Sequence, residues 1–342
     1  MLRFDFRPYC RPFCQPLQTA HGLWAKRTGL LLRFEDEQGQ VRFGEVAPIP
    51  WFGTETQAQA RAFCDRFPRH FAPEQIDQIP DNLPACQFGF SAVSPLSREA
   101  ALRLHPQSLS QAWERDWPLE NFGDAPRDMC ALLPTGAGAL QGWRSLWQRG
   151  HRTFKWKIGV VAVAEELALF QKLVETVPPE LRLRLDANGG LTPDAAATWL
   201  AACDRAPITI EFLEQPLPPA TILDWLSQIA GRFQTAIALD ESVATLQQLQ
   251  RVYQQVGDRG VYVVKPAIAG DPQQLLDFCL SNRLDVVFSS ALATPVGRNR
   301  ALELAQRSWA AGLPQRALGF GVSHWFADDW ASLSEAALWA RL

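Results

Sequence analysis

Five ionisable side chains recur at similar intervals along the second half of the chain, each at or beside the end of a short apolar run. They are Lys157, Asp186, Glu214, Asp240 and Lys265. Three carboxylates that share one cavity repel one another and raise one another's pKa unless a cation neutralises them. A hard divalent ion suits oxygen ligands and leaves coordination positions for a substrate carboxylate. The spacing therefore predicts a metal site, with Mg²⁺ as the expected ion and Mn²⁺ as its alternative.

Neighbouring residues on the same runs add to this predicted site. Because side chains two apart on a strand face the same way, Lys155 should point inward with Lys157, and Arg184 with Asp186. Two adjacent buried ammonium groups lower each other's pKa, so we expect a lysine here to act as a neutral base near pH 7. We expect Arg184 to support the site.

The last two runs carry small residues at their ends. Ser289 and Ser290 are placed to donate hydrogen bonds to a second carboxylate of a substrate. The final run ends in Gly319, Phe320 and Gly321, which offer no carboxylate to receive a substrate ammonium. We therefore expect a substrate that carries carboxylates rather than an amino group.

Eight apolar runs alternate with stretches of helical length, a pattern typical of a parallel barrel with its active site at the strand ends. The runs are residues 130–134, 153–157, 181–186, 208–214, 235–240, 261–265, 284–290 and 317–321. We therefore predict an α/β fold with a (β/α)8-type barrel at residues 126–322.

Residues 1–125 have a different pattern, which predicts an N-terminal α+β domain. Short β-like runs and one helical stretch alternate there, at residues 2–7, 29–34, 41–45 and 55–67. A chain of 342 residues is long enough for a barrel with a smaller companion. The remaining residues, 323–342, form a C-terminal segment that we expect to return to the first domain.

A loop at residues 47–56 separates the third β-like run from the helical stretch. It contains two prolines, one glycine and the adjacent aromatics Trp51 and Phe52, which predict an ordered loop rather than a flexible linker. The two aromatic rings either anchor the loop or cover a site, and the sequence leaves both interpretations open.

The composition favours a small-molecule substrate. The formal net charge is −3 and the basic residues are scattered, so neither a nucleic acid nor a membrane surface is an expected partner. No window approaches the roughly 18 apolar residues of a membrane helix, and we expect a cytoplasmic location. The seven cysteines lack zinc-ligand spacing and are interpreted as reduced thiols. The oligomeric state stays open, with a monomer slightly favoured.

Taken together, the motifs resemble the muconate-lactonizing subgroup of the enolase superfamily. The resemblance lies in Lys155-Trp-Lys157, Asp186-Ala-Asn188, Glu214-Gln-Pro216, Asp240-Glu-Ser242 and Lys265-Pro266. It implies a modified (β/α)7β barrel with an N-terminal α+β capping domain, and a Lys base working beside a metal ion.

Carried over to this chain, the resemblance implies a role for each residue. Asp186, Glu214 and Asp240 would be the metal ligands, with Asn188 in support, Lys157 the acid/base, and Lys265 the group across the substrate plane. Strand alternation favours Asp240 over the adjacent Glu241 as the third ligand.

Residues 44–56, GEVAPIPWFGTET, most resemble the corresponding loop of the dehydratases of menaquinone and phylloquinone biosynthesis, where it forms part of a lid. The substrate implied is 2-succinyl-6-hydroxy-2,4-cyclohexadiene-1-carboxylate. Lys157 would remove its α-proton, the metal and Lys265 would stabilise the enediolate, and loss of water would give an aromatic product.

Two other functions remain open. A racemase or epimerase of the same subgroup, most nearly an N-acylamino acid racemase, would use both lysines as bases. Dipeptide epimerisation is less favoured, because the last strand lacks paired aspartates for a substrate ammonium. From another class, the chain could be a non-catalytic binding barrel.

Overall fold

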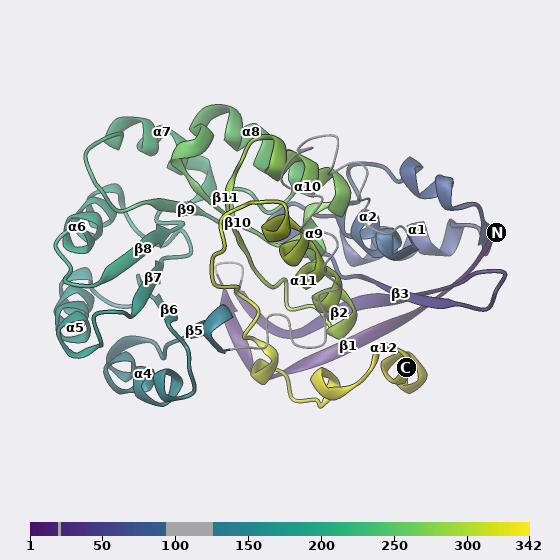
Figure 1. Cartoon of the computed structure of the whole chain (residues 1–342), viewed down its shortest axis with the longest axis horizontal. Helices are drawn as coiled ribbons and strands as arrows, with labels where there is room; N and C mark the ends of the chain where they lie inside the picture. Colours follow the sequence, from purple (N-terminus) through teal and green to yellow (C-terminus); the bar gives the residue numbers. More distant parts are fainter. Residues whose placement is uncertain (20–21, 94–125) are drawn as a thin grey trace.

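The computed structural model describes residues 1–19, 22–93 and 126–342, which form two sheets (Figure 1). In this part of the chain, a four-stranded sheet has the order β3-β2-β1-β4, and a seven-stranded sheet has the order β11-β10-β9-β8-β7-β6-β5. The predicted domain boundary between residues 125 and 126 falls at the end of the stretch 94–125, which lies outside the described residues.

The N-terminal sheet is antiparallel and packs on two helices. Its strands are β1 (Leu2–Thr19), β2 (Gly22–Glu35), β3 (Val41–Val46) and β4 (His70–Phe71). The helices are α1 (Gln57–Arg66) and α2 (Pro84–Phe90). Alternating apolar side chains of the strands meet the helices in a core that contains Phe4, Phe34, Phe71 and Phe90.

The first two strands extend well beyond the predicted runs 2–7 and 29–34. Their pairing continues from Arg3↔Glu35 to Thr19↔Gly22, with an irregularity between Pro12 and Leu17. The prolines of β1 obscured this in the sequence. They are accommodated because β4 pairs only with Leu2 and Arg3, and among the described residues β1 otherwise has, besides its pairing with β2, only the isolated bridge Phe13↔Phe326.

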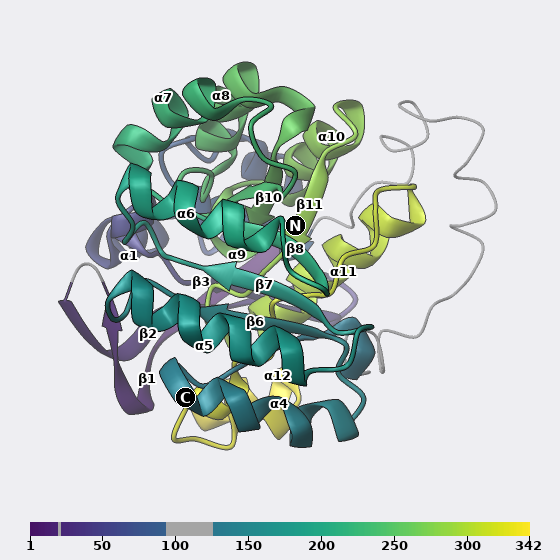
Figure 2. The ribbon, with the colours of Figure 1, turned by 90° about the vertical axis from the view of Figure 1, so that its left-hand side faces the viewer.

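The second sheet is parallel and has helices along its outer side (Figure 2). Its strands are β5 (Cys130–Leu132), β6 (Thr153–Lys157), β7 (Arg182–Asp186), β8 (Thr209–Glu214), β9 (Ile237–Leu239), β10 (Val261–Val264) and β11 (Asp285–Phe288). The helices are α4 (Ala139–Gln148), α5 (Val163–Thr176), α6 (Pro193–Cys203), α7 (Pro219–Ile229), α8 (Leu246–Val256), α9 (Pro266–Ala269), α10 (Pro272–Ser281) and α11 (Pro295–Ala310). The alternation predicted from the sequence is confirmed for these seven strands.

The eighth predicted run, residues 317–321, forms no regular strand, so this part of the prediction was wrong. It makes two isolated bridges, Met129↔Leu318 on the β5 side and Ser289↔Gly319 on the β11 side. A Cβ at Gly319 would lie 2.6 Å from Ser289 Oγ, so the backbone needs glycine to approach this closely. The segment thus bridges the two edges of the sheet in the place of an eighth strand.

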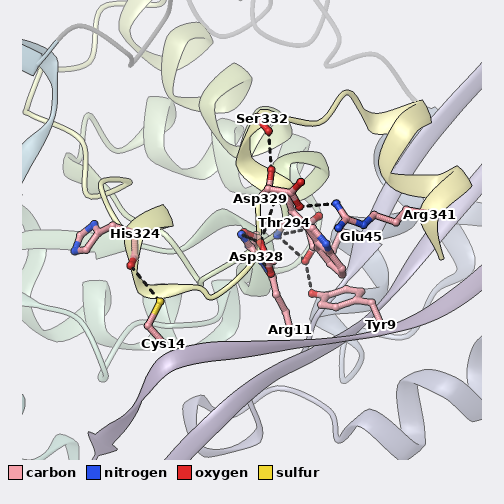
Figure 3. A network of polar contacts seen from close by, with 12 residues as sticks. Tyr9, Arg11, Cys14, Glu45, Thr294, His324, Asp328, Asp329, Ser332 and Arg341 are labelled. Atoms are coloured by element: carbon pink, nitrogen blue, oxygen red, sulfur yellow. Dashed lines mark hydrogen bonds and ion pairs between the residues drawn. The ribbon is translucent and has the colours of Figure 1, made fainter.

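A buried polar network joins the N-terminal sheet to the barrel (Figure 3). Glu45 of β3 accepts hydrogen bonds from Thr294 N at 2.9 Å and Gly297 N at 2.9 Å, at the start of α11, and from the Tyr9 hydroxyl at 2.5 Å. A carboxylate is stabilised at a helix N-terminus by the free N–H groups and the helix dipole. One domain therefore caps a helix of the other.

The C-terminal segment lies against the N-terminal sheet, where yellow α12 (Glu335–Arg341) runs next to β1 in Figure 1. Arg11 of β1 pairs with Asp328 through two hydrogen bonds and stacks on Phe326, with its guanidinium carbon 3.5 Å from the ring centroid. Of the helices in the described residues, none is long and apolar enough to cross a membrane.

Candidate active site

The strand register brings the three predicted ligand carboxylates together. Asp186 pairs with Lys157 on one side and with Glu214 on the other, and Glu214 pairs with Ala238, two residues before Asp240. The three carboxylate residues are at most 5% exposed. They therefore form a buried arc at the carboxyl ends of β7, β8 and β9.

Two lysines form ion pairs with this arc. Lys155 Nζ lies 2.8 Å from Asp186 Oδ2 and 2.7 Å from Glu214 Oε1, while Lys265 forms an ion pair with Asp240. Burial acts to lower the pKa of Lys155, but the attraction of Asp186 and Glu214 outweighs it and the pKa is raised. The expectation that Lys155 would have a lowered pKa was therefore wrong, because carboxylates rather than Lys157 are its nearest charged neighbours.

The lowered lysine pKa belongs to Lys265 instead. Burial lowers the pKa of Lys265 to about 7, against the attraction of Glu214. The ion pair with Asp240 also favours the charged form, so burial and pairing act in opposite directions on this side chain. Lys157, by contrast, is exposed at the end of β6.

A fourth carboxylate, Glu241, lies close to the arc. Burial, reinforced by the charge of Asp186, raises its pKa to about 7. Asn188 links the two carboxylates, because its backbone N–H donates to Asp186 Oδ1 at 3.0 Å and its Nδ2 donates to Glu241 Oε1 at 3.1 Å. Asn188 Oδ1 and Glu241 Oε2 are both buried without a hydrogen-bond partner.

This donor set fits a hard divalent cation. Burial raises the pKa of Glu214, and the charge of Asp186 raises it further, which shows the need for positive charge between these groups. Within the described residues no three His, Cys, Asp or Glu are arranged as a formed metal site. Lys155 Nζ lies within 2.8 Å of both Asp186 and Glu214, so these side chains would rearrange around a cation.

Gln215 has a positioning role that sequence reasoning missed. This fully buried residue accepts hydrogen bonds from Asp240 N at 3.0 Å and Ser242 N at 3.3 Å, and its Nε2 donates to Ser242 Oγ at 2.8 Å. It therefore sets the backbone of the turn that carries Asp240. The signal in the sequence was its place in the motif Glu214-Gln-Pro216, to which no role had been assigned.

Arg184 lies inside the barrel, and within the described residues it forms no hydrogen bond or ion pair with any of the three carboxylates. Its Nε donates to Glu211 Oε2 at 2.6 Å and its Nη1 to Ala317 O at 2.8 Å. These contacts tie β8 to the segment that bridges the sheet edges. Arg184 therefore stabilises the barrel interior, two residues before Asp186 on β7, and does not hold the carboxylates directly.

The end of β11 lies next to the bridging segment. Ser289 N donates to Val264 O at 2.8 Å, and Ser290 Oγ accepts from Leu292 N at 2.9 Å. Both serines are half-buried, and Gly321 is exposed. Within the described residues the Ser290 hydroxyl accepts a hydrogen bond and donates none, which leaves its proton for a substrate oxygen.

Residues 47–56, the aromatic loop, reach the site from the N-terminal domain. The ring centroid of Phe52 lies 4.8 Å from Lys265 Nζ. Trp51 is 37% exposed and packs edge-on against Trp24, with centroids 4.9 Å apart. One aromatic residue thus anchors the loop while the other covers a lysine of the site. A separate hollow of about 240 Å³ on the N-terminal sheet, beside His70, is distant in the fold from these groups.

Comparison with known proteins agrees with this architecture. A family described as "MenC, N-terminal domain" matches residues 9–95, and one described as "Enolase C-terminal domain-like" matches residues 139–306. The o-succinylbenzoate synthase of Thermosynechococcus vestitus is 40% identical over 100% of this chain and 99% of its own length.

Two solved structures are also similar. The o-succinylbenzoate synthase of Thermosynechococcus elongatus, complexed with Mg in the active site, superimposes with a TM-score of 0.82 at 40% identity, over 99% of this chain and all of that chain. The L-Ala-D/L-Glu epimerase of Bacillus subtilis has a TM-score of 0.70 at 20% identity, over 96% and 91% of the two chains, and shares the fold. The chain belongs to the o-succinylbenzoate synthase family of the enolase superfamily.

Proposed function

We propose that this protein is a metal-dependent dehydratase that converts 2-succinyl-6-hydroxy-2,4-cyclohexadiene-1-carboxylate to o-succinylbenzoate in menaquinone or phylloquinone biosynthesis. The observation that carries the proposal is the full-length identity of 40% to an o-succinylbenzoate synthase. The buried arc of carboxylates with a lysine on either side supports it.

Asp186, Glu214 and Asp240 would hold Mg²⁺, the ion present in the similar o-succinylbenzoate synthase structure. When bound, the ion polarises the substrate carboxylate and makes the neighbouring proton more acidic. Asn188 and Gln215 keep the carboxylates in place through the hydrogen bonds described above.

The two lysines come from opposite sides of the barrel mouth. β6 and β10 are separated by β7, β8 and β9 in the sheet order, and the complete ring has seven strands and one bridging segment. Lys157 and Lys265 are therefore on opposite sides of the barrel axis, with the carboxylates between them. A flat substrate placed over the carboxylates presents one face to each lysine.

In the proposed reaction Lys157 Nζ takes the α-proton as the C–H bond breaks, and the electron pair moves towards the substrate carboxylate. Lys265 stabilises the resulting negative charge from the other side. Lys157 then returns the proton to the hydroxyl group, the C–O bond breaks and water leaves. The ring becomes aromatic, which favours the forward direction.

The aromatic loop would close this site. Phe52 already lies over Lys265, and Trp51 occupies the outer side of the loop. Exclusion of water strengthens the electrostatic interactions inside the site. Ser289 and Ser290 lie across the mouth from β7 in the sheet order and would bind the succinyl carboxylate.

A racemase is the second candidate, because lysines on opposite faces could each remove a proton. The solved epimerase shares the fold at only 20% identity, so it favours no particular reaction. The bridging segment ends in Gly319, Phe320 and Gly321 and offers no carboxylate to a substrate ammonium. This absence in the sequence disfavours amino-acid and dipeptide substrates.

The deciding experiment is turnover of the cyclohexadiene carboxylate by the purified protein, followed through the appearance of the aromatic product. We expect conversion with Mg²⁺, its loss with a chelator, and its return on adding Mg²⁺. No conversion in the presence of Mg²⁺ would contradict the proposed function, and racemisation of an N-acylamino acid as the faster reaction would favour the second candidate.

A further inference from the structure

The side chain of Gln248 lies between helix α8 and the aromatic loop. Its Nε2 donates to Phe52 O at 3.2 Å, and its Oε1 accepts from Thr245 N at 3.0 Å. Because one end of the amide faces a carbonyl and the other faces an N–H, its partners determine its orientation. One side chain therefore completes the cap of α8 and also binds a loop that is 196 residues away in the chain.

The turn of the loop is shaped around this contact. Gly53 has a φ of +91°, which favours glycine, and its N–H donates to Pro50 O at 2.9 Å. A Cβ at this position would lie 2.4 Å from Gln248 Nε2. Any larger residue would therefore push the amide away from Phe52 O.

Both ends of the contact lead directly to the site. On the loop side, the Phe52 ring covers Lys265 at 4.8 Å. On the barrel side, α8 begins after the turn that carries Asp240, and Thr245 is its N-cap residue. Gln248 thus joins the end of β9 to the loop that shields Lys265.

The base of the loop is held separately. The buried side chain of Arg27 donates to Pro48 O at 2.8 Å and to Ala47 O, and also to Ala291 O at 3.1 Å in the barrel. Ile49 is buried in the barrel core. Loss of the Gln248 contact would therefore release the tip of the loop and leave its base in place.

We propose that Gln248 is a positioning residue that latches the tip of the aromatic loop over the site, with its amide holding the Phe52 backbone while the Phe52 ring shields Lys265. The effect on catalysis rests on the proposed function. The latch itself is a property of the loop and is tested independently of turnover.

Gln248→Glu tests the latch, because it keeps the oxygen that accepts from Thr245 N and replaces the donor to Phe52 O by a second oxygen. We expect amide hydrogen exchange in residues 49–54, measured by mass spectrometry, to become about tenfold faster. The hydrogen bond from Gln248 to Phe52 O is lost in this variant, and the Phe52 carbonyl is left without this donor. In the Mg²⁺-loaded enzyme, kcat/KM should fall about tenfold, with both kcat and KM affected. The melting temperature should hardly change.

Gln59→Glu is the matched control, because Gln59 forms the same capping box with Thr56 at the start of α1. It should leave exchange in residues 49–54 and kinetics unchanged. Gln248→Met removes the donor without adding a charge and should reproduce the loop effect even if the glutamate variant folds poorly.

Unchanged exchange and unchanged kinetics in both Gln248 variants would overturn the latch. A lowered melting temperature with normal kinetics per folded molecule would also overturn it, since a cap of α8 alone predicts that result. If the wild-type protein lacks dehydratase activity, the proposed function fails, and the exchange rates of residues 49–54 still decide whether the latch exists.

Discussion

At the scale of single residues, the two lysines differ in their surroundings although both border the same carboxylates. Lys157 is exposed at the end of β6, whereas Lys265 is buried, paired with Asp240 and covered by Phe52. An exposed amine can exchange its proton with the substrate and with solvent, while a buried lysine, when charged, stabilises negative charge in a low-dielectric site. Different roles for the two lysines are therefore a prediction that substitution can test.

Substitution of each lysine should separate these roles. Lys157→Ala should lower kcat by roughly 10²- to 10⁴-fold, the usual contribution of general acid–base catalysis. It should also abolish exchange of the α-proton of a slow substrate analogue in deuterated solvent. Lys265→Ala should lower kcat but retain some exchange. Near-normal dehydration by Lys157→Ala would rule out the proposed base.

The carboxylates can be ranked by metal binding without measuring activity. Asp186→Asn, Glu214→Gln and Asp240→Asn should each weaken Mg²⁺ or Mn²⁺ binding by more than the roughly 10- to 100-fold typical of residues outside the ligand shell. Glu241→Gln should weaken it less than Asp240→Asn. Isothermal titration calorimetry checks this order, and the reverse order would make Glu241 the third ligand.

The raised pKa of Glu241 predicts a pH dependence of stability in the metal-free protein. Because burial and Asp186 raise this pKa from 4.5 to about 7, the folded chain holds the proton more tightly than the unfolded chain. The stabilisation is fully present below about pH 4.5 and is lost as the pH rises through about 7.

We therefore expect the free energy of unfolding of the chelated protein to fall between pH 5 and pH 8, and to fall less in Glu241→Gln. Denaturant titrations at several pH values measure this difference. Parallel curves for the two proteins would show that Glu241 does not carry the effect.

At the scale of elements, one domain supplies the cap of a helix in the other. The Glu45 carboxylate accepts hydrogen bonds from two backbone N–H groups and from the Thr294 hydroxyl at the start of α11. The aromatic loop begins two residues after Glu45 in the chain. Glu45 thus positions both α11 and the base of the aromatic loop. The capping box of Thr245 and Gln248 on α8 has the same double use, because it continues into the contact with Phe52.

Loss of the Glu45 carboxylate should be costly. Glu45→Ala leaves buried donors without an acceptor and removes a negative charge that attracts the buried Arg27 guanidinium, so we expect a loss of about 3 kcal/mol or more in the free energy of unfolding. Tyr9→Phe removes only one hydrogen bond to the same carboxylate and should cost about 1 kcal/mol. Equilibrium unfolding in urea measures both, and equal losses for the two variants would contradict the capping role.

At the scale of the whole molecule, the barrel core and the carboxylate site are energetically separate. Large apolar side chains such as Trp156 and Trp199 pack between the strands and the surrounding helices, and strand alternation puts Trp156 on the opposite face of β6 from Lys155. Lys155 and Lys265 form ion pairs with the carboxylates at the strand ends. The packing of the fold therefore does not depend on a metal ion.

Removal of metal should accordingly abolish turnover and leave the fold intact. We expect the circular dichroism spectrum to be unchanged after dialysis against a chelator, and Mg²⁺ to raise the melting temperature by mass action as it binds. Loss of the folded signal on chelation would show that the carboxylate arc needs the ion for folding.

The local features of this protein followed from its sequence. Strand β6 begins and ends where the run 153–157 predicted, and five successive strands, β6 to β10, carry the expected ionisable residues at their ends or one residue beyond. The alternation of side chains along a strand and the apolar runs depend only on neighbours in the chain, so they can be recognised without knowledge of the fold. The strand containing the prolines of β1 is longer than predicted, and residues 317–321 with their glycines form isolated bridges instead of the predicted strand. The reason is that only the pairing partners decide whether such residues extend a strand.

Tertiary structure alone decided how the ionisable groups behave and what holds them. The raised pKa of Lys155, the lowered pKa of Lys265 and the contacts of Gln215 and Gln248 all depend on groups brought together from distant strands and loops. A sequence states which charges a chain carries but not their separations or burial, and a pKa depends on both. For the same reason, the sequence identified the aromatic loop and its two possible uses, while the fold placed Phe52 over Lys265.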